Sequence, residues 1–175
     1  LVVIDEAYID FSTQKSLVSD LPSYPNLIIT QTLSKAYGLA GIRLGICIAS
    51  QEIIDILNKI KPPYNINSLT QERAISALAD WDTTQGQVTQ LIAERKVLFA
   101  QLEKISFIEK VYPSDANFLL VRVDDANKRY VQLIENDIVV RNRSNQVGCE
   151  NCLRFSVGTP QENQILIETL NRLST

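Results

Sequence analysis

The chain has 175 residues, a net charge of −3 and 45% hydrophobic residues. This length can bury one good core, or two small cores joined by a long element. Lysine and arginine are scattered along the chain, which argues against nucleic acid as a partner. No apolar run approaches membrane-spanning length and the start does not read as a signal peptide, so we expect a cytoplasmic protein.

The first part of the chain alternates short apolar runs with helical patterns. Residues 1–4, 27–30 and 44–49 are apolar on both faces, as in the strands of a parallel sheet that is covered by helices. Ser50 is expected to cap a helix that Pro62 and Pro63 end. The stripe of that helix comprises Ile53, Ile54, Leu57 and Ile60.

A longer amphipathic stretch follows over residues 70–102, with a break expected at 82–86. It is typical of a connector between two bodies. We therefore predict a first domain over residues 1–75, a connecting helix over 76–104, and a smaller α+β domain over 105–175.

Within the smaller domain the patterns predict strands at 118–123, 138–141 and 153–157 and a helix at 130–135. Thr159 and Glu162 have the spacing of a capping box, with Pro160 at the first helical position. A last helix is therefore expected, with its apolar stripe formed by Ile165, Leu166, Leu170 and Leu173.

The run QTLSKAYGLAGIRLG gathers the residue types that a phosphorylated cofactor bound through an amine requires. Hydroxyls, open backbone amides and a fork-shaped guanidinium bind phosphate, and Thr32, Ser34 and Arg43 supply such side chains. A lysine that joins a carbonyl must be unprotonated near neutral pH, and burial and a cation such as Arg43 favour that state of Lys35. Taken singly, a loop lysine is usually solvated and glycines mark turns.

The segment DEAYIDF lies upstream and begins where the first apolar strand ends. Asp5 is placed there to hold the proton of a heterocyclic nitrogen as a buried carboxylate, and Tyr8 follows three positions later. The simpler interpretation of Asp5 is a loop cap. The full set of residues in this order carries more weight than any one of them.

Three cysteines are present, at positions 47, 149 and 152. Cys149 and Cys152 have the spacing of a metal or redox pair, but a single pair in a chain without histidine cannot complete a zinc site, so no metal is predicted. Cys47 lies in an apolar run and is expected to be an inert core residue.

The two segments together resemble the pyridoxal-phosphate aminotransferases of the aspartate-aminotransferase fold type. Their residue sequences are similar to those of the histidinol-phosphate aminotransferase branch. The resemblance implies an α/β fold, in which residues 1–75 form part of a three-layer, mostly parallel large domain and the C-terminal residues form a small α+β domain. It also implies a homodimer.

In that family, the cofactor is pyridoxal 5′-phosphate, and the resemblance assigns it the following residues. Lys35 forms the Schiff base and moves a proton, and Asp5 holds the ring proton. Tyr8 would donate to the phenolic oxygen of the cofactor if the chain turns back after the strand. The remaining cofactor-binding residues are Thr32, Ser34 and Arg43.

Two arginines of the smaller domain have family-like positions for binding the acidic group of the substrate. Arg154 lies in the segment LRFSVGTP, and Arg141 follows the apolar run at 138–140. A bidentate guanidinium orients a carboxylate or a phosphate. The alternative is a structural salt bridge on an edge strand.

The resemblance implies a transaminase that acts on histidinol phosphate and 2-oxoglutarate in histidine biosynthesis. Because half of the family's polypeptide would precede residue 1, the sequence is expected to be a C-terminal fragment that is inactive alone. Two alternatives stay open. One is a decarboxylase of the same fold that acts on an O-phosphorylated amino acid, and the other is a folded, non-catalytic fragment that binds no cofactor.

Overall fold

A computed structural model describes residues 1–174 of the chain. Its contacts divide the chain into two compact units, Leu1–Val88 and a second that begins at Thr89. Each unit has its own sheet, and each is described by itself below.

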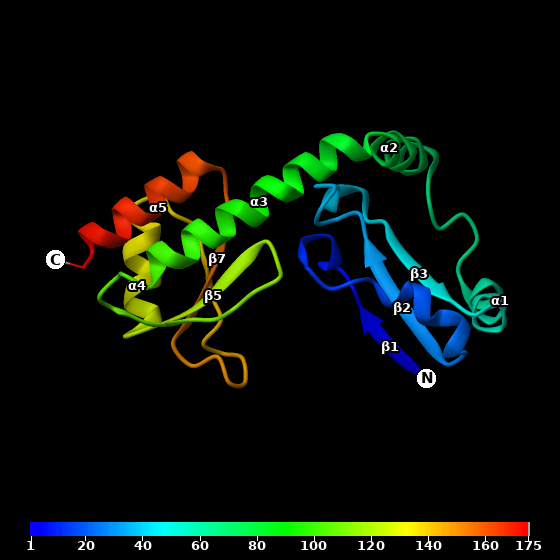
Figure 1. The fold of residues 1–175 in the computed structure, drawn as a ribbon, viewed down its shortest axis with the longest axis horizontal. Coiled ribbons are helices and arrows are strands. Elements are labelled where there is room, and N and C mark those ends of the chain that lie inside the picture. The colour runs from blue at the N-terminus through cyan, green and yellow to red at the C-terminus, as the bar shows by residue number, and fades with distance from the viewer. Residues whose placement is uncertain (175) are drawn as a thin grey trace. The chain divides into compact units, whose positions relative to one another are not determined.

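The sheet of the first unit has three strands in the order β1-β2-β3 (Figure 1). They are β1 (Val2–Asp5), β2 (Leu27–Thr32) and β3 (Gly45–Ala49). The central strand β2 pairs with β1 in parallel and with β3 in antiparallel orientation. The predicted strand runs are confirmed, but the third run is not parallel as its apolar pattern suggested.

The direction of β3 follows from the connection that precedes it. A parallel crossover needs a long connection, usually a helix. Residues 33–44 contain only one short 3₁₀ turn, at Ala40–Ile42, so the chain returns beside β2 in the opposite direction. Both ends of this loop therefore lie at one edge of the sheet.

Three helices follow in the first unit, and the third continues into the second unit. They are α1 (Gln51–Ile60), α2 (Ser68–Ala79) and α3 (Trp81–Leu102). The Ser50 side chain does not cap α1, because its hydroxyl donates to the Pro25 carbonyl. The helix break falls at Asp80 rather than at 82–86, and Gly86 lies within α3, where a glycine costs only about 1 kcal/mol relative to alanine.

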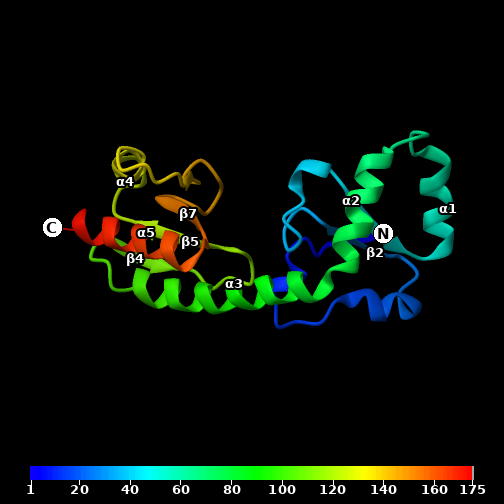
Figure 2. The same ribbon diagram turned by 90° about the horizontal axis from the view of Figure 1, so that it is seen from above.

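The second unit contains an antiparallel four-stranded sheet in the order β4-β5-β7-β6. Its strands are β4 (Ile108–Val111), β5 (Phe118–Val123), β6 (Arg141–Asn142) and β7 (Cys152–Ser156). The helices α4 (Ala126–Ile134) and α5 (Pro160–Arg172) join the last turns of α3 around its core (Figure 2). Alternate residues of β5 and β7 enter this core, among them Leu119, Val121, Val123, Leu153 and Phe155.

In this unit, one predicted strand is corrected and one strand was not predicted. The run at 138–141 forms only the short strand β6, because Asp137 has a left-handed φ of 60° and Val139 is 79% exposed. Strand β4 was missed, because polar residues and a register shift between Ile108 and Lys110 interrupt its pattern.

The last helix begins as the sequence predicts. The Thr159 hydroxyl accepts from the Glu162 amide, and the Glu162 carboxylate accepts from the Thr159 amide, which completes a capping box. Over residues 1–174, no helix is long and apolar enough to cross a membrane.

Candidate functional site

The predicted cofactor residues of the first unit lie at one edge of its sheet. Asp5 ends β1 and Thr32 ends the parallel neighbour β2, so both lie at the carboxyl edge, where open α/β sheets bind ligands. Gly45 pairs with Thr32 across the antiparallel strands. Arg43, two residues before Gly45, therefore lies at the same edge.

Asp5 accepts two hydrogen bonds that hold its side chain at the strand end. Its Oδ1 accepts from the Ala7 amide at 3.0 Å and from the Thr30 hydroxyl at 3.4 Å. The carboxylate is exposed, whereas the sequence predicted a buried one, because β1 is an edge strand of its sheet. These two hydrogen bonds are compatible with a carboxylate that only caps the loop, and also with one that binds the ring nitrogen of a cofactor.

Tyr8 and Lys35 come together from different loops. The chain turns back after β1, with the Ile9 amide donating to the Glu6 carbonyl at 3.1 Å. The Tyr8 ring then lies below the Lys35 amine, whose Nζ is 5.3 Å from the ring centroid. A cation at this distance is attracted by the ring.

Thr32 and Ser34 form a compact hydroxyl pair at the start of the lysine loop. The Thr32 hydroxyl donates to Ser34 Oγ at 2.8 Å or to the Leu44 carbonyl at 3.2 Å, and it accepts from the Ser34 amide at 3.0 Å. These bonds fix the turn that presents Lys35, and the contact with Leu44 links the two ends of the loop.

The same loop requires left-handed backbone at two places. Gly38 has a φ of 64°, which glycine adopts without steric cost. Arg43 has a φ of 56°, an uncommon value for a residue with a side chain, and its Nη1 donates to the Ala40 carbonyl at 2.9 Å. Because a guanidinium has five donors, this bond leaves further donors for an anion.

Glu6 is a buried residue of this region that the sequence analysis did not single out. Its carboxylate accepts from the Ser16 hydroxyl at 2.7 Å, the Gln31 amide group at 2.9 Å and the Leu17 amide at 2.8 Å. Burial opposes the charged form, but these three bonds outweigh it and lower the pKa of Glu6. The carboxylate thus ties the loop after β1 to β2. The sequence signal that could have identified Glu6 is a charged residue directly after an apolar strand.

The donor set at this edge fits a phosphorylated carbonyl cofactor. It combines one amine, two hydroxyls on one turn, an arginine with remaining donors, a carboxylate and a phenol. A phosphate needs the hydroxyls and the guanidinium, and a carbonyl group needs the amine. These are the residues that the resemblance predicts to hold pyridoxal phosphate, namely Asp5, Tyr8, Thr32, Ser34, Lys35 and Arg43.

In the second unit, Arg141 lies directly opposite Arg154 across strands β6 and β7. Like charges opposite each other on one sheet face destabilise the pair. Neither arginine forms a salt bridge within residues 1–174. The salt-bridge alternative therefore has no support, and an anion between the two guanidinium groups would remove the repulsion.

Arg154 also has an unsatisfied donor. Its Nε is buried without a hydrogen-bond partner, and its guanidinium lies 4.9 Å from the centroid of the Phe118 ring. Stacking on the Phe118 ring fixes the orientation of the guanidinium plane of Arg154. A buried donor without a partner is costly, so Arg154 is prepared to bind an acceptor.

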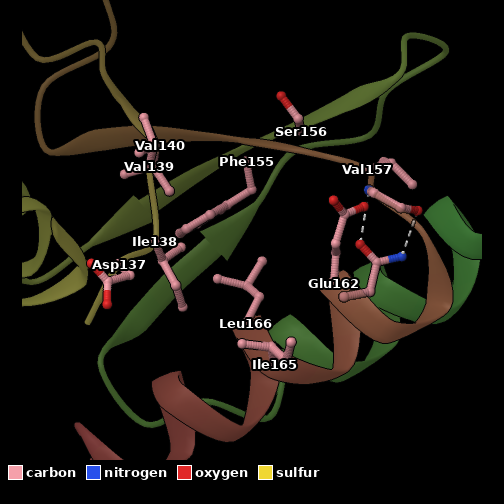
Figure 3. Close-up of a pocket in the computed structure, with 12 residues that line it drawn as sticks. Asp137, Ile138, Val139, Val140, Phe155, Ser156, Val157, Glu162, Ile165 and Leu166 are labelled. Atoms are coloured by element: carbon pink, nitrogen blue, oxygen red, sulfur yellow. Dashed lines mark hydrogen bonds between the residues drawn. The ribbon is translucent and has the colours of Figure 1, made fainter.

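A pocket of about 520 Å³ also lies in the second unit, between β7, α5 and residues 137–140. Figure 3 shows Ile138, Phe155, Ile165 and Leu166 around it. The Glu162 carboxylate in its wall is engaged in the capping box. No arginine or lysine lines the pocket, so the arginine pair remains the better candidate for binding an anionic substrate. Residues 1–174 hold no group of three or more side chains that could bind a metal ion.

The chain belongs to the class I and II aminotransferases, whose family model matches residues 1–170. Histidinol-phosphate aminotransferase of Flavobacterium johnsoniae is 59% identical over 174 residues, which are 99% of this chain and 50% of that protein. The enzyme of the same name from Flavobacterium psychrophilum is 61% identical over 173 residues, with the same coverage. The chain thus spans about half the length of the curated relatives it matches.

Solved structures agree with this family. Histidinol-phosphate aminotransferase of Clostridium acetobutylicum matches 98% of this chain and 53% of its own chain, with a TM-score of 0.92 and 30% identity. The enzyme of Sinorhizobium meliloti, solved in complex with pyridoxal-5′-phosphate, has a TM-score of 0.86 and 26% identity over 99% of this chain and 48% of its own. A decarboxylase from Sulfurospirillum multivorans has a TM-score of 0.88 and 28% identity, over 99% and 52% respectively.

Proposed function

We propose that the protein is a pyridoxal-phosphate-dependent aminotransferase that exchanges an amino group between histidinol phosphate and 2-oxoglutarate in histidine biosynthesis. The observation that carries the proposal is the position of Lys35. Its amine lies over the Tyr8 ring, at the edge of the sheet where strand β1 ends with Asp5. The identity to histidinol-phosphate aminotransferases supports the choice of substrates.

When bound, pyridoxal phosphate supplies an electron sink that weakens the bonds at the α-carbon of an amine substrate. Lys35 would hold the cofactor through its Nζ, and this amine, once a substrate amine has displaced it, would move the α-proton as a general base. The Asp5 carboxylate would hold a proton on the ring nitrogen. The Tyr8 phenol would donate a hydrogen bond to the ring oxygen.

The remaining residues bind and orient. Thr32, Ser34 and Arg43 hold the cofactor phosphate through hydroxyl and guanidinium donors. Arg154, assisted by Arg141, binds the anionic group of the substrate, and the buried Nε of Arg154 gains an acceptor there. Because two forks fix a phosphate or a carboxylate in one orientation, the reacting carbon is held in a defined position.

We further propose that the protein acts as a homodimer in the cytoplasm. Support for association comes from exposed apolar side chains on and between α1 and α2, which are Ile56, Ile60, Tyr64, Leu69 and Ile75. Large apolar side chains exposed together on neighbouring elements are typical of protein interfaces.

A second candidate is a pyridoxal-phosphate-dependent decarboxylase of an O-phosphorylated amino acid. The likeness to the Sulfurospirillum multivorans decarboxylase favours it. Both candidates use an amine, a ring-nitrogen partner and an arginine site for an acidic group, so the site residues described here fit either reaction.

The test uses a full-length protein that contains this sequence. It is incubated with histidinol phosphate and 2-oxoglutarate, and glutamate is measured. In parallel, carbon dioxide release from O-phosphothreonine is followed. Glutamate formation alone supports the proposal, and carbon dioxide release alone supports the decarboxylase. If neither product forms and borohydride traps no cofactor, the chain is a non-catalytic protein.

A further inference from the structure

Cys149 and Cys152 lie at the two ends of one tight turn. The Cys152 amide donates to the Cys149 carbonyl at 3.0 Å, and Asn151 between them has a left-handed φ of 55°. A β-turn brings the Cα atoms of its first and fourth residues within about 7 Å. Disulfides join Cα atoms that are about 4.4–6.8 Å apart. The backbone of this turn therefore holds the two Cα atoms at a separation that a disulfide can join.

The two thiols differ in their surroundings. Cys152 is fully buried as the first residue of β7, whereas Cys149 is half-buried in the preceding loop. All cysteines of the chain are free thiols. A small oxidant can therefore approach Cys149, and Cys152 is protected from direct reaction.

A cation lies beside the buried thiol. Arg122 on β5 pairs directly with Cys152 on β7. An arginine guanidinium is always charged in proteins, and the hydrogen bond to the Cys152 thiol, followed by the Tyr112 phenol, raises the pKa of Arg122 further. A positive charge next to sulfur stabilises the negative charge that sulfur carries as it attacks a disulfide.

We propose that Cys149 and Cys152 form a redox modification site, in which Cys149 is the entry thiol and Cys152 the resolving thiol of a reversible intramolecular disulfide. The oxidant is a small-molecule disulfide of the glutathione type. This inference does not depend on the proposed aminotransferase activity.

The exchange occurs in two balanced steps. The Cys149 thiolate attacks one sulfur of glutathione disulfide, forms a mixed disulfide and releases one glutathione. Cys152 then attacks the Sγ of Cys149, which breaks the mixed disulfide and releases the second glutathione. The two protein thiols lose two protons and two electrons, and the oxidant becomes two molecules of reduced glutathione.

The disulfide would form at the start of the strand that carries Arg154. Cys152 is two residues before Arg154 in β7, and its carbonyl accepts from the Arg143 amide at 2.8 Å. The cross-link would thus join the strand to its preceding turn. No other covalent bond constrains this turn in the described part of the chain.

Cys47 is exposed on β3, so the expectation that it is an inert core residue is wrong. The experiment uses a Cys47→Ser chain, which removes this exposed thiol that could react between molecules. The chain is incubated with glutathione disulfide, alkylated and examined by mass spectrometry. We expect a mass loss of two hydrogen atoms, a linked peptide that contains both cysteines, and full reversal by dithiothreitol.

Four variants in the same background test the roles. Cys152→Ser should accumulate a stable glutathione adduct at Cys149, and Cys149→Ser should leave Cys152 unmodified while the chain is folded. Arg122→Gln should close the disulfide about tenfold more slowly, whereas Arg122→Lys, which keeps the charge, should close it faster than Gln. Circular dichroism verifies that each variant is folded.

Any of three results would overturn the proposal. The first is a mixed disulfide at Cys149 that persists although Cys152 is present. The second is a disulfide between two chains instead of within one. The third is retention of both thiols under conditions in which glutathione disulfide oxidises the exposed Cys47 of the unmodified chain.

Discussion

The amine of Lys35 lies 5.3 Å from the centroid of the Tyr8 ring. Lys35 comes from the loop after β2, and Tyr8 comes from the turn after β1. This contact brings the two candidate cofactor residues together. It also gives the lysine one preferred position, which is the condition for a reproducible covalent attachment.

Replacement of Lys35 by alanine should abolish covalent trapping of pyridoxal phosphate. The amine is the proposed point of attachment, and its removal leaves the neighbouring turn bonds of Thr32 and Ser34 intact. The measurement is borohydride reduction followed by peptide mapping. Lys61→Ala, at an exposed lysine after α1, is the matched control and should trap as the unmodified protein does. Trapping at another lysine in the Lys35→Ala protein would reject the assignment.

The Asp5→Asn substitution separates charge from shape. Asparagine keeps the Oδ1 acceptor for the Ala7 amide and the Thr30 hydroxyl, so we expect little change in melting temperature. It removes the charge that favours a protonated ring nitrogen. Turnover of a full-length protein should therefore fall much more than its cofactor content does. Equal turnover in both proteins would mean that Asp5 only caps the loop.

The facing arginines should show opposite effects on stability and on binding. Arg141→Gln removes one of two like charges that are paired across β6 and β7, so the free energy of unfolding should stay equal or rise by about 0.2–1 kcal/mol. The apparent affinity for an anionic substrate should fall. Urea denaturation and Michaelis constants measure the two effects. A loss of stability without a change of affinity would make the pair structural.

Arg154→Lys tests the geometry of the fork. Lysine keeps the charge but cannot form two parallel bonds or stack on Phe118 in the same way. The Michaelis constant for the substrate should rise by about tenfold or more, which is the expected loss of one charge-assisted hydrogen bond. Cofactor attachment at Lys35 should persist. An unchanged Michaelis constant would contradict the anchoring role.

Glu6 should make the stability of the first unit dependent on pH. Its folded-state pKa lies below the ordinary value of 4.5, although burial alone would raise it. The stability that its charge contributes is therefore complete above that value and is lost as the pH falls through the folded-state pKa.

The Glu6→Gln substitution should remove this dependence and lower the free energy of unfolding by about 1–3 kcal/mol at neutral pH, because an amide cannot accept all three hydrogen bonds. Unfolding curves between pH 3 and 7, a window set around the unfolded-state value, measure both effects. Glu52→Gln on the exposed side of α1 is the control. A pH dependence that persists unchanged in Glu6→Gln would assign it to other carboxylates.

The open edge of β1 should make the 175-residue chain self-associate. Val2 and Val3 are 49% and 61% exposed on a strand that pairs only with β2. Unpaired edges with apolar side chains template further pairing. Sedimentation velocity should show association that rises with concentration and that Val3→Lys reduces, while Thr13→Lys in an exposed turn does not. A monomer at all concentrations would contradict this expectation.

Local sequence signals predicted much of this fold. The capping box of Thr159 and Glu162 was readable because its partners are three residues apart, and the apolar runs at β1, β2, β5 and β7 were readable from their composition. The direction of β3 was not readable from its own residues, because an apolar run looks alike in either orientation. The short length of β6 depends on the left-handed backbone of Asp137, and the hydrophobic periodicity of the sequence does not show this conformation.

The site was predictable to the extent that its residues share one motif. Thr32, Ser34 and Lys35 are neighbours, and the structure places them on one turn. The opposition of Arg141 and Arg154 depends on strand register, which the sequence does not display. The bonds of Glu6 to Ser16, Leu17 and Gln31 join three segments, so the sequence shows a charged residue after an apolar strand but not the partners of its carboxylate.

The loop that carries Lys35 also bears on the order in which the chain folds. Strands β2 and β3 pair across residues 33–44, whereas β5 and β7 pair across residues 124–151. The entropy cost of closing a loop rises with its length, so the shorter closure is favoured kinetically. We expect the β2–β3 hairpin to form before β5 and β7 pair in the second unit. The lysine and Arg43 would then be ordered by contacts that are local in the sequence, early in the folding of the chain.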